Sequence, residues 1–260
     1  MTMEPQIPLT AVTREVSATL NECQLTCKPR ETIDVPLARR QHAAYESALR
    51  SLGVKVTTLP ARDEFPDAVF VEDAALVLDE IAVVTTPGTP SRAAEGEAIA
   101  GTLAAYRALH RITLPGTLDG GDIVRIDKAL YVGRSTRSND AGIAQLRAIV
   151  APFGYSVSAV PVTGALHLKT ACTYAGRRTL LANPAWADLS AFEDVSVLEA
   201  AEPWGASVLD VNGTLVMPSS YPRTKALLES KGFKTLAVDL SELQKAEGGP
   251  TCLSLLFSSL

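Results

Sequence analysis

Two residues of the chain could together carry out nucleophilic chemistry, Cys252 and His167. Cys252 follows two glycines and a proline, and the glycines permit a tight turn and close approach of a substrate. A thiolate can form a covalent intermediate, and an imidazole can protonate a leaving amine and later take a proton from water. Each residue alone also fits a packed core position, which is our interpretation of Cys172. His42 and His110 lie in helix patterns, which leaves His167 as the candidate.

Charged residues of both signs lie near these two. Asp67, Glu72 and Asp73 lie in an apolar run, where a carboxylate needs a partner, and a guanidinium offers paired N–H donors that match carboxylates. Arg92 and Arg137 lie at the expected starts of helices, where a cation opposes the helix dipole unless an anion binds nearby. Alternatively, the three carboxylates lie at a solvated strand end, and the two arginines are ordinary surface residues. Together the two sets predict a zwitterionic amino acid with a cationic side chain as the ligand.

Strand and helix patterns that must position these residues alternate along the chain. Strand patterns cover 54–59, 69–78, 81–85, 123–126, 129–132, 179–181, 215–217, 233–238 and 252–257. Helix patterns cover 37–52, 92–109, 140–150 and 222–230. The alternation predicts an α/β fold.

A weak internal repeat recurs at an interval of about 45 residues. Its units are predicted to start with a strand, a tight turn and a second strand, and most continue through a helix to a further strand. The unit starts carry the reactive residues: Glu72, Asp73, Asp119, Asp122, His167 and Cys252. The helices disfavour an all-β propeller, and a Rossmann-type sheet is disfavoured because no Gly-x-Gly-x-x-Gly follows a strand. We therefore predict a ring in which the C-terminal strand meets the N-terminal segment and the unit starts converge on the axis.

Composition excludes several classes of protein. A net charge of −5 argues against a nucleic-acid or anionic-membrane partner. No apolar run approaches a membrane span, and the N-terminus lacks a secretory pattern, so we expect a cytoplasmic protein. The four cysteines are interpreted as reduced thiols, and Cys23 and Cys27 lack the further ligands that a structural zinc site needs.

From about residue 39 to 257 the chain resembles the dimethylarginine dimethylaminohydrolases of the guanidino-modifying pentein superfamily. The motifs that carry the resemblance are Phe65-Pro-Asp67-Ala-Val-Phe-Val-Glu72-Asp73, Leu118-Asp119-Gly-Gly-Asp122, Ser135-Thr-Arg137-Ser-Asn139, Leu166-His167-Leu-Lys-Thr170, Met217-Pro-Ser-Ser-Tyr-Pro-Arg223 and Gly248-Gly-Pro-Thr-Cys252-Leu-Ser254. The resemblance implies a five-unit ββαβ propeller with pseudo-fivefold symmetry, formed by residues 1–260 as one catalytic domain. It also implies hydrolysis of methylated free L-arginine to citrulline, with no metal or organic cofactor.

The resemblance also assigns catalytic roles by position. Cys252 would attack the guanidinium carbon, giving an S-alkylthiouronium intermediate. His167 would protonate the departing methylamine or dimethylamine and then activate water. Asp73 and Asp119 would hold and polarise the guanidinium, although some bacterial relatives carry Glu where this chain has Asp119.

The remaining roles implied by the resemblance concern substrate binding. Asp67 and Glu72 would help to bind the substrate, and Arg92 and Arg137 would bind its α-carboxylate. Two residues would contribute backbone carbonyls: Leu20 and Ala246.

Two other activities and one non-enzymatic function remain as alternatives. Arginine deiminases act on unmodified arginine but generally carry an extra helical domain. Agmatine deiminases take a substrate without a carboxylate, which Arg92 and Arg137 argue against. A non-enzymatic pentein resembling the ribosome anti-association factor would not need Cys252, His167 and the acids together. The sequence does not decide between monomethyl and dimethyl groups, and it is compatible with a homodimer.

Overall fold

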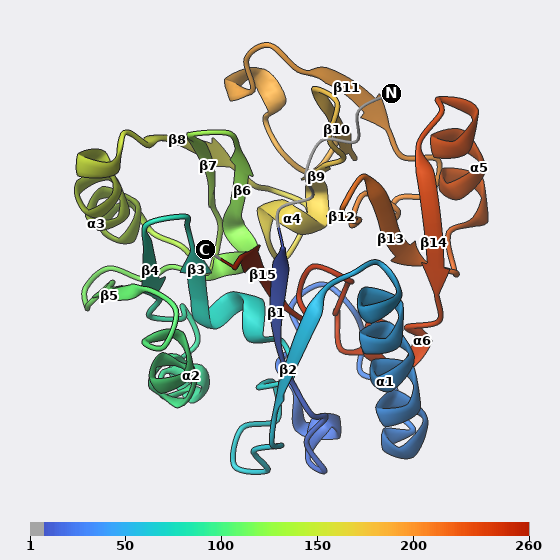
Figure 1. Ribbon diagram of the computed structural model, residues 1–260, viewed down its shortest axis with the longest axis horizontal. Coiled ribbons are helices and arrows are strands. Elements are labelled where there is room, and N and C mark those ends of the chain that lie inside the picture. The colour runs from blue at the N-terminus through green and yellow to red at the C-terminus, as the bar shows by residue number, and fades with distance from the viewer. Residues whose placement is uncertain (1–7, 260) are drawn as a thin grey trace.

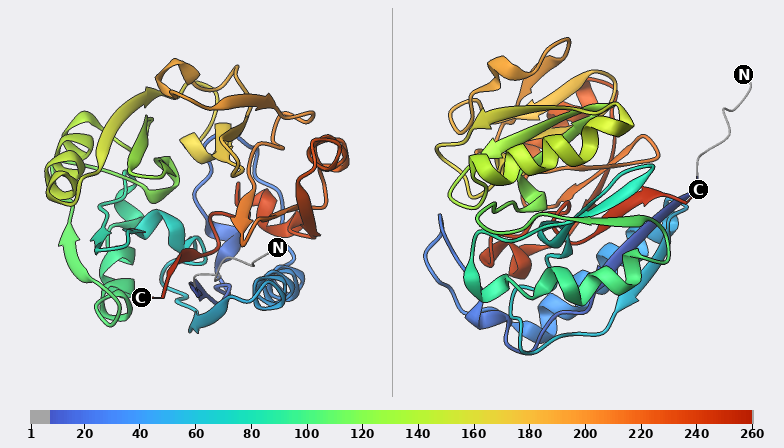
Figure 2. Two further views of the ribbon diagram at one scale, coloured as in Figure 1. Left: turned by 45° about the horizontal axis from the view of Figure 1, so that its top comes forward. Right: turned by 90° about the vertical axis from the view of Figure 1, so that its left-hand side faces the viewer.

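The computed structural model describes residues 8–259, which form five three-stranded sheets arranged in a ring (Figures 1 and 2). The sheet orders are β15-β1-β2, β3-β4-β5, β6-β7-β8, β9-β10-β11 and β12-β13-β14. The strands are β1 (Leu9–Arg14), β2 (Lys55–Leu59), β3 (Ala75–Val77), β4 (Ile81–Val84), β5 (Ala108–Arg111), β6 (Ile123–Ile126), β7 (Ala129–Arg134), β8 (Ser156–Pro161), β9 (Cys172–Tyr174), β10 (Thr179–Ala182), β11 (Ser196–Glu199), β12 (Leu209–Val211), β13 (Thr214–Pro218), β14 (Lys234–Val238) and β15 (Leu255–Ser258).

Each sheet is built in the same way. The middle strand pairs antiparallel with the inner strand and parallel with the outer one. Inner strands of neighbouring sheets contact one another, β15 with β3 and β9 with both β6 and β12. The five inner strands therefore surround the axis, as the repeat predicts.

A parallel pair needs a crossover connection, and helices provide it in four of the five sheets. These helices are α1 (Val35–Ser51), α2 (Glu95–Leu103), α3 (Asp140–Val150) and α5 (Pro222–Ser230), and they lie on the outside of the ring (Figure 2). The sheet β9-β10-β11 has only a 3-10 turn, η6 (Leu189–Ala191), in that place. Most units thus contain the predicted helix.

Three short 3-10 helices lie in the same crossovers as α1, α2 and α3: η1 (Leu20–Glu22), η3 (Pro90–Arg92) and η5 (Ala151–Phe153). The other short helices lie outside the crossovers: α4 (Leu168–Ala171), α6 (Ser241–Lys245), η2 (Val71–Ala74) and η4 (Gly120–Asp122). No helix among residues 8–259 is long and apolar enough to cross a membrane.

The ring closes where the chain ends meet. β1 pairs antiparallel with β15, with Thr10 opposite Phe257 and Val12 opposite Leu255. Val12, Leu255 and Phe257 pack in one buried cluster with residues of the sheet β3-β4-β5. The predicted closure by the C-terminal strand is confirmed.

Three predicted boundaries are wrong. The strand pattern at 69–78 leaves only β3, because the buried acids Glu72 and Asp73 need partners at the axis and lie in the turn η2. The helix pattern at 92–109 contains α2 and then β5, so His110 lies on a strand, where pairing with β4 overrides the alanine-rich helix propensity. In the pattern at 252–257, β15 begins at Leu255, and Cys252 lies in the preceding turn.

Candidate active site

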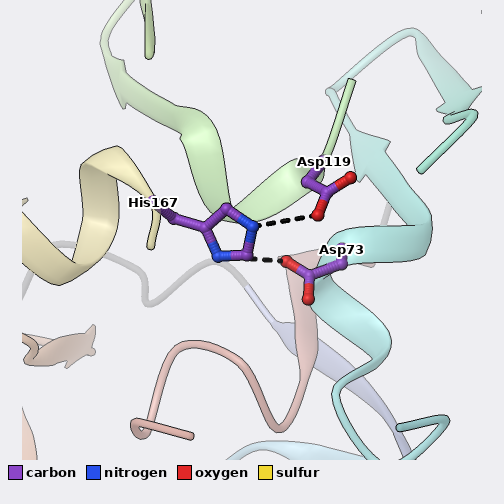
Figure 3. Close-up of side chains that lie close together, drawn as sticks. All are labelled: Asp73, Asp119 and His167. Atoms are coloured by element: carbon purple, nitrogen blue, oxygen red, sulfur yellow. Dashed lines mark hydrogen bonds and ion pairs between the residues drawn. The ribbon is translucent and has the colours of Figure 1, made fainter. Parts of the chain in front are cut away.

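The turns that precede the inner strands carry the predicted reactive residues. Asp73 lies in η2 before β3, and Asp119 immediately precedes η4, which leads into β6. His167 immediately precedes α4, which leads into β9, and Cys252 lies in the turn before β15. Asp73, Asp119 and His167 meet at the axis (Figure 3). Cys252 lines a cavity together with Asp73 and His167. The predicted convergence of the unit starts is confirmed.

The imidazole of His167 lies between two buried carboxylates (Figure 3). Its Nε2 atom is 2.9 Å from Oδ2 of Asp119, and its Nδ1 atom is 3.8 Å from Oδ1 of Asp73. Burial lowers the pKa of His167, but Asp73, the hydrogen bond to Asp119 and the charge of Asp122 outweigh burial and raise this pKa to about 9. His167 is therefore an imidazolium at neutral pH.

Asp122 connects the turns that carry Asp119 and His167 through hydrogen bonds. Its Oδ2 atom accepts hydrogen bonds of 2.6 Å from the hydroxyls of Ser135 and Ser138, and its Oδ1 atom accepts the backbone N–H of Leu168 at 2.9 Å. Burial raises the pKa of Asp122 to about 6, with His167 and the two serines opposing the increase. Asp122 thus joins the Asp119 turn to the residue that follows His167.

The thiol of Cys252 lies in a tight turn. The backbone N–H of Gly249 donates to its Sγ atom at 3.4 Å. Burial and the charges of Glu72 and Asp73 raise the pKa of Cys252 to about 12. The resting residue is therefore a neutral thiol, and a cation bound beside it would favour the thiolate.

The two arginines differ in their partners. The guanidinium of Arg92 is buried, with Nη1 2.7 Å from Oδ2 of Asp73 and Nη2 2.7 Å from Oε2 of Glu95. Arg137 donates to the hydroxyls of Thr26, at 3.0 Å, and Thr89. Over residues 8–259 Arg137 forms no ion pair with a carboxylate, so its charge is available to an anionic ligand.

One cavity, here called the axial cavity, collects most of the predicted residues. Its lining comprises Gln24, Asp67, Phe70, Asp73, Arg92, Arg137, Leu166, His167, Ala246, Glu247, Gly248 and Cys252. Carboxylates, two arginines, a histidine and a cysteine thus face one enclosed volume. This arrangement suits a ligand that carries both a cation and an anion.

Three predicted residues lie outside the axial cavity: Asp119, Leu20 and Glu72. Asp119 is fully buried and contacts the site through Nε2 of His167. Leu20 is fully buried, and its carbonyl accepts the N–H of Cys23 at 3.1 Å. Glu72 is joined to Lys169 at 2.6 Å and lines a side cavity, which shares Cys252 and His167 with the axial cavity. Glu72 and Lys169 also line a larger cavity of about 460 Å³. Lys169 was not predicted to have a role, although it lies in the motif that contains His167.

Three donors of the centre could also hold a metal ion. One ligand atom each of Asp73, Asp119 and His167 lies within 4.8 Å of the other two. Oxygen and nitrogen donors of this kind suit a divalent cation such as zinc. In the structure these donors instead form the hydrogen bond and ion pair described above.

The ring of five sheets and the cysteine, histidine and carboxylate centre define a pentein-type hydrolase. The family model for "N,N dimethylarginine dimethylhydrolase, eukaryotic" matches residues 8–183. The N(G),N(G)-dimethylarginine dimethylaminohydrolase of Pseudomonas aeruginosa is 38% identical over 228 residues, which cover 86% of this chain and 90% of the relative. The Streptomyces coelicolor enzyme of the same name is 38% identical over 252 residues, covering 96% and 97%. The chain belongs to the dimethylarginine dimethylaminohydrolase family.

Solved structures agree with this assignment. A mutant of the Pseudomonas aeruginosa enzyme complexed with citrulline matches with a TM-score of 0.92 at 34% identity, covering 97% of this chain and all of the other. The N-terminal domain of ArgZ, a cyanobacterial arginine dihydrolase, matches with a TM-score of 0.85 at 18% identity. The second similarity concerns the fold alone.

Proposed function

We propose that the protein hydrolyses free L-arginine methylated on a terminal guanidinium nitrogen, giving L-citrulline and dimethylamine or methylamine. The observation that carries the proposal is the axial cavity, where Cys252 and His167 lie with carboxylates and with Arg137. The citrulline complex of the similar Pseudomonas aeruginosa enzyme supports citrulline as the product.

Substrate binding would use the two signs of charge in the axial cavity. Asp67 and Asp73 would face the guanidinium, with Asp119 polarising it from behind His167. Arg137 would bind the α-carboxylate, since its charge has no ion-pair partner among the described residues. Arg92 would also help to bind the α-carboxylate, although most of its guanidinium N–H groups already donate to Asp73 and Glu95. The backbone carbonyls of Ala246, which lines the cavity, and of Leu20 would also bind the substrate.

Glu72 would act indirectly. Its Oε1 atom is joined to Lys169, while its Oε2 atom is buried with no hydrogen-bond partner in the described part of the chain. Burial raises the pKa of Glu72, and Lys169 opposes that increase. We infer that Lys169 stabilises Oε1 of this carboxylate, and that a guanidinium bound beside Cys252 would give Glu72 a second cationic neighbour.

The chemistry would proceed in two halves. The bound cation lowers the pKa of the Cys252 thiol, whose proton passes to solvent. Sulfur then attacks the guanidinium carbon, the bond from that carbon to the methylated nitrogen breaks, and the amine leaves with a proton from His167. Water next attacks the S-alkylthiouronium carbon, giving a proton to His167. The carbon–sulfur bond then breaks, the second proton of the attacking water passes to the sulfur of Cys252, and neutral citrulline leaves. Asp73 and Asp119 stabilise the positive charge of His167 before the first half and again after the second, when the imidazole is protonated.

Product analysis tests this proposal. The wild-type protein is incubated with asymmetric dimethylarginine, monomethylarginine, arginine and agmatine, and both citrulline and the released amine are quantified. We expect dimethylamine and methylamine from the methylated substrates, and turnover at least ~10⁴-fold lower for Cys252→Ser. Ammonia from arginine as the main product would show a deiminase instead. Near-normal turnover by Cys252→Ser would refute the assigned nucleophile.

A further inference from the structure

Residues 24–28, here called the cover segment, line the site. Gln24 lines the axial cavity, and Lys28 lines the side cavity. The backbone N–H of Gln24 donates to Oδ1 of Asp67 at 3.0 Å, and Arg137 donates to the hydroxyl of Thr26. Both partners are residues to which we assign substrate binding. The cover segment therefore lies against the substrate-binding groups themselves.

The carboxylate of Glu247 accepts three consecutive backbone N–H groups of this segment. Its Oε1 atom accepts from Cys27 and Lys28, each at 2.6 Å, and its Oε2 atom accepts from Thr26 at 3.1 Å. Successive N–H groups around one anion form a nest, and hydrogen bonds to a charged acceptor are stronger than neutral ones. The cover segment is thus held mainly by one buried side chain.

Glu247 lies in the stretch of chain that leads to the nucleophile. Its neighbours Ala246 and Gly248 both line the axial cavity, and Cys252 follows five residues later. Its φ angle is 61°, a left-handed conformation that a residue with a side chain adopts only at a cost. That backbone conformation accompanies a carboxylate that reaches residues more than 200 positions earlier in the chain. Such a conformation persists when surrounding contacts fix it.

Lys28 forms a second link between the cover segment and the stretch of chain that leads to Cys252. Nζ of Lys28 donates to the carbonyl of Gln244 at 2.8 Å and lies 4.6 Å from the ring centroid of Trp204. Gln244 and Trp204 both line the side cavity. Both contacts of Lys28 require the cover segment to lie over the site.

We propose that Glu247 is a positioning residue that holds the cover segment closed over bound substrate. It joins the segment to the stretch that carries Cys252, so that the substrate-binding groups and the nucleophile keep one geometry. This inference rests on the proposed function for its kinetic consequence. The closing of the segment itself does not depend on which substrate is bound.

Hydrogen exchange measures the three bonds directly, and Glu247→Gln is the informative variant. The glutamine keeps the size of the side chain but removes its charge and turns an N–H donor toward backbone N–H groups. The peptide that covers residues 24–28 should be protected from exchange in the wild-type protein. In Glu247→Gln we expect its exchange to be at least tenfold faster. Glu242→Gln is the matched control, because Glu242 is a buried glutamate of α6 that accepts the N–H of Asp34 at 2.8 Å, away from both cavities. Unchanged exchange in Glu247→Gln, or an equal increase in Glu242→Gln at 24–28, would overturn the proposal.

Steady-state kinetics on dimethylarginine then separates positioning from chemistry. Glu247→Gln should raise KM at least tenfold with kcat within about threefold of wild type, and Glu247→Asp, which keeps the charge, should recover part of the loss. A fall in kcat at unchanged KM would contradict the assigned role. If Glu247→Gln fails to fold, Glu247→Asp carries both measurements and is expected to be intermediate; wild-type values in both would overturn the proposal. Inactivity of the wild-type protein on methylarginines would refute the proposed function alone, since exchange at 24–28 is read without turnover.

Discussion

At the scale of single residues, the site depends on how charges are paired at the axis. His167 is flanked by Asp73 and Asp119, and Asp73 is also joined to Arg92, which is joined to Glu95. The five side chains form one buried chain of alternating sign. Each carboxylate therefore has a cationic partner before any ligand binds, and the cost of burying it is reduced.

The pKa of His167 should depend on Asp119. Replacing Asp119 with Asn removes the charge that is 2.9 Å from Nε2, so the pKa of His167 should fall from about 9 by about 1 to 3 pH units. An NMR titration of the imidazole resonances measures this in the Cys252→Ser background, with His167 assigned by its loss in His167→Gln. The chain has only three histidines, which makes the assignment direct. An unchanged pKa in Asp119→Asn would mean that Asp119 does not support the imidazolium.

The same group gives the stability of the protein a pH dependence. The folded pKa of His167 is raised above its ordinary 6.5, so its contribution is complete below about pH 6.5 and is lost as the pH rises through about 9. The 2.5-unit difference corresponds to about 3 kcal/mol. Urea unfolding from pH 6 to 9.5 should show wild type losing about this much relative to His167→Gln. A pH-independent difference between the two proteins would contradict the assigned pKa.

At the scale of elements, the turns before the inner strands decide where the side chains lie. Gly121 of η4 donates its backbone N–H to Oδ1 of Asp73 at 3.1 Å. A Cβ atom at Gly121 would lie 2.7 Å from that oxygen and 2.7 Å from Nδ1 of His167. The backbone of η4 therefore touches both catalytic groups and leaves no room for a side chain.

Gly121→Ala should displace Asp73 or His167. We expect turnover to fall at least ~10²-fold, together with a loss of about 1–3 kcal/mol in the free energy of unfolding. Gly101→Ala is the matched control, because Gly101 lies in α2 and a Cβ atom added there would meet no other atom within 4 Å. That control should keep full activity and gain about 0.5–1 kcal/mol. Wild-type activity in Gly121→Ala would show that the turn tolerates displacement.

A helix or strand can be predicted from the sequence when the interactions that form it are local. The predicted helix at 140–150 is confirmed residue for residue, because Asn139 caps it and its apolar spacing faces the core. β8 and β11 were not predicted, since they are half-exposed outer strands fixed by pairing with β7 and β10. Long-range pairing of this kind leaves little pattern in a single strand.

The same distinction applies to the site. The repeat predicted that Asp73, Asp119, His167 and Cys252 would meet, because it placed them at equivalent positions of a ring. The partners of Arg92 and Glu72 were not predicted. Glu95 lies only three residues after Arg92, a spacing that could have indicated the pair, whereas Lys169 lies 97 residues from Glu72 and nothing local joins them.

At the scale of the whole molecule, the site exists only when the ring is closed. β15 begins three residues after Cys252 and pairs with β1, so the nucleophile lies beside the seam between the two ends of the chain. The hydroxyl of Tyr45, from α1, donates to the carbonyl of Pro250 at 2.8 Å and is 2.7 Å from the hydroxyl of Ser254. The first sheet and its helix therefore fix the turn that carries Cys252.

Weakening this seam should reduce both stability and activity. Phe257 is 5% exposed and packs edge-on against Tyr106 with ring centroids 5.1 Å apart, so Phe257→Ala should lower the free energy of unfolding by about 3–5 kcal/mol. Phe192→Ala is the matched control: Phe192 is 8% exposed and stacks on Tyr131 with centroids 4.1 Å apart, between other sheets. Both variants should be destabilised in urea unfolding. Measured where both remain folded, kcat should fall only in Phe257→Ala, because only that residue lies in the strand that follows Cys252. An equal fall in both would mean that turnover reports general stability and not closure of the ring.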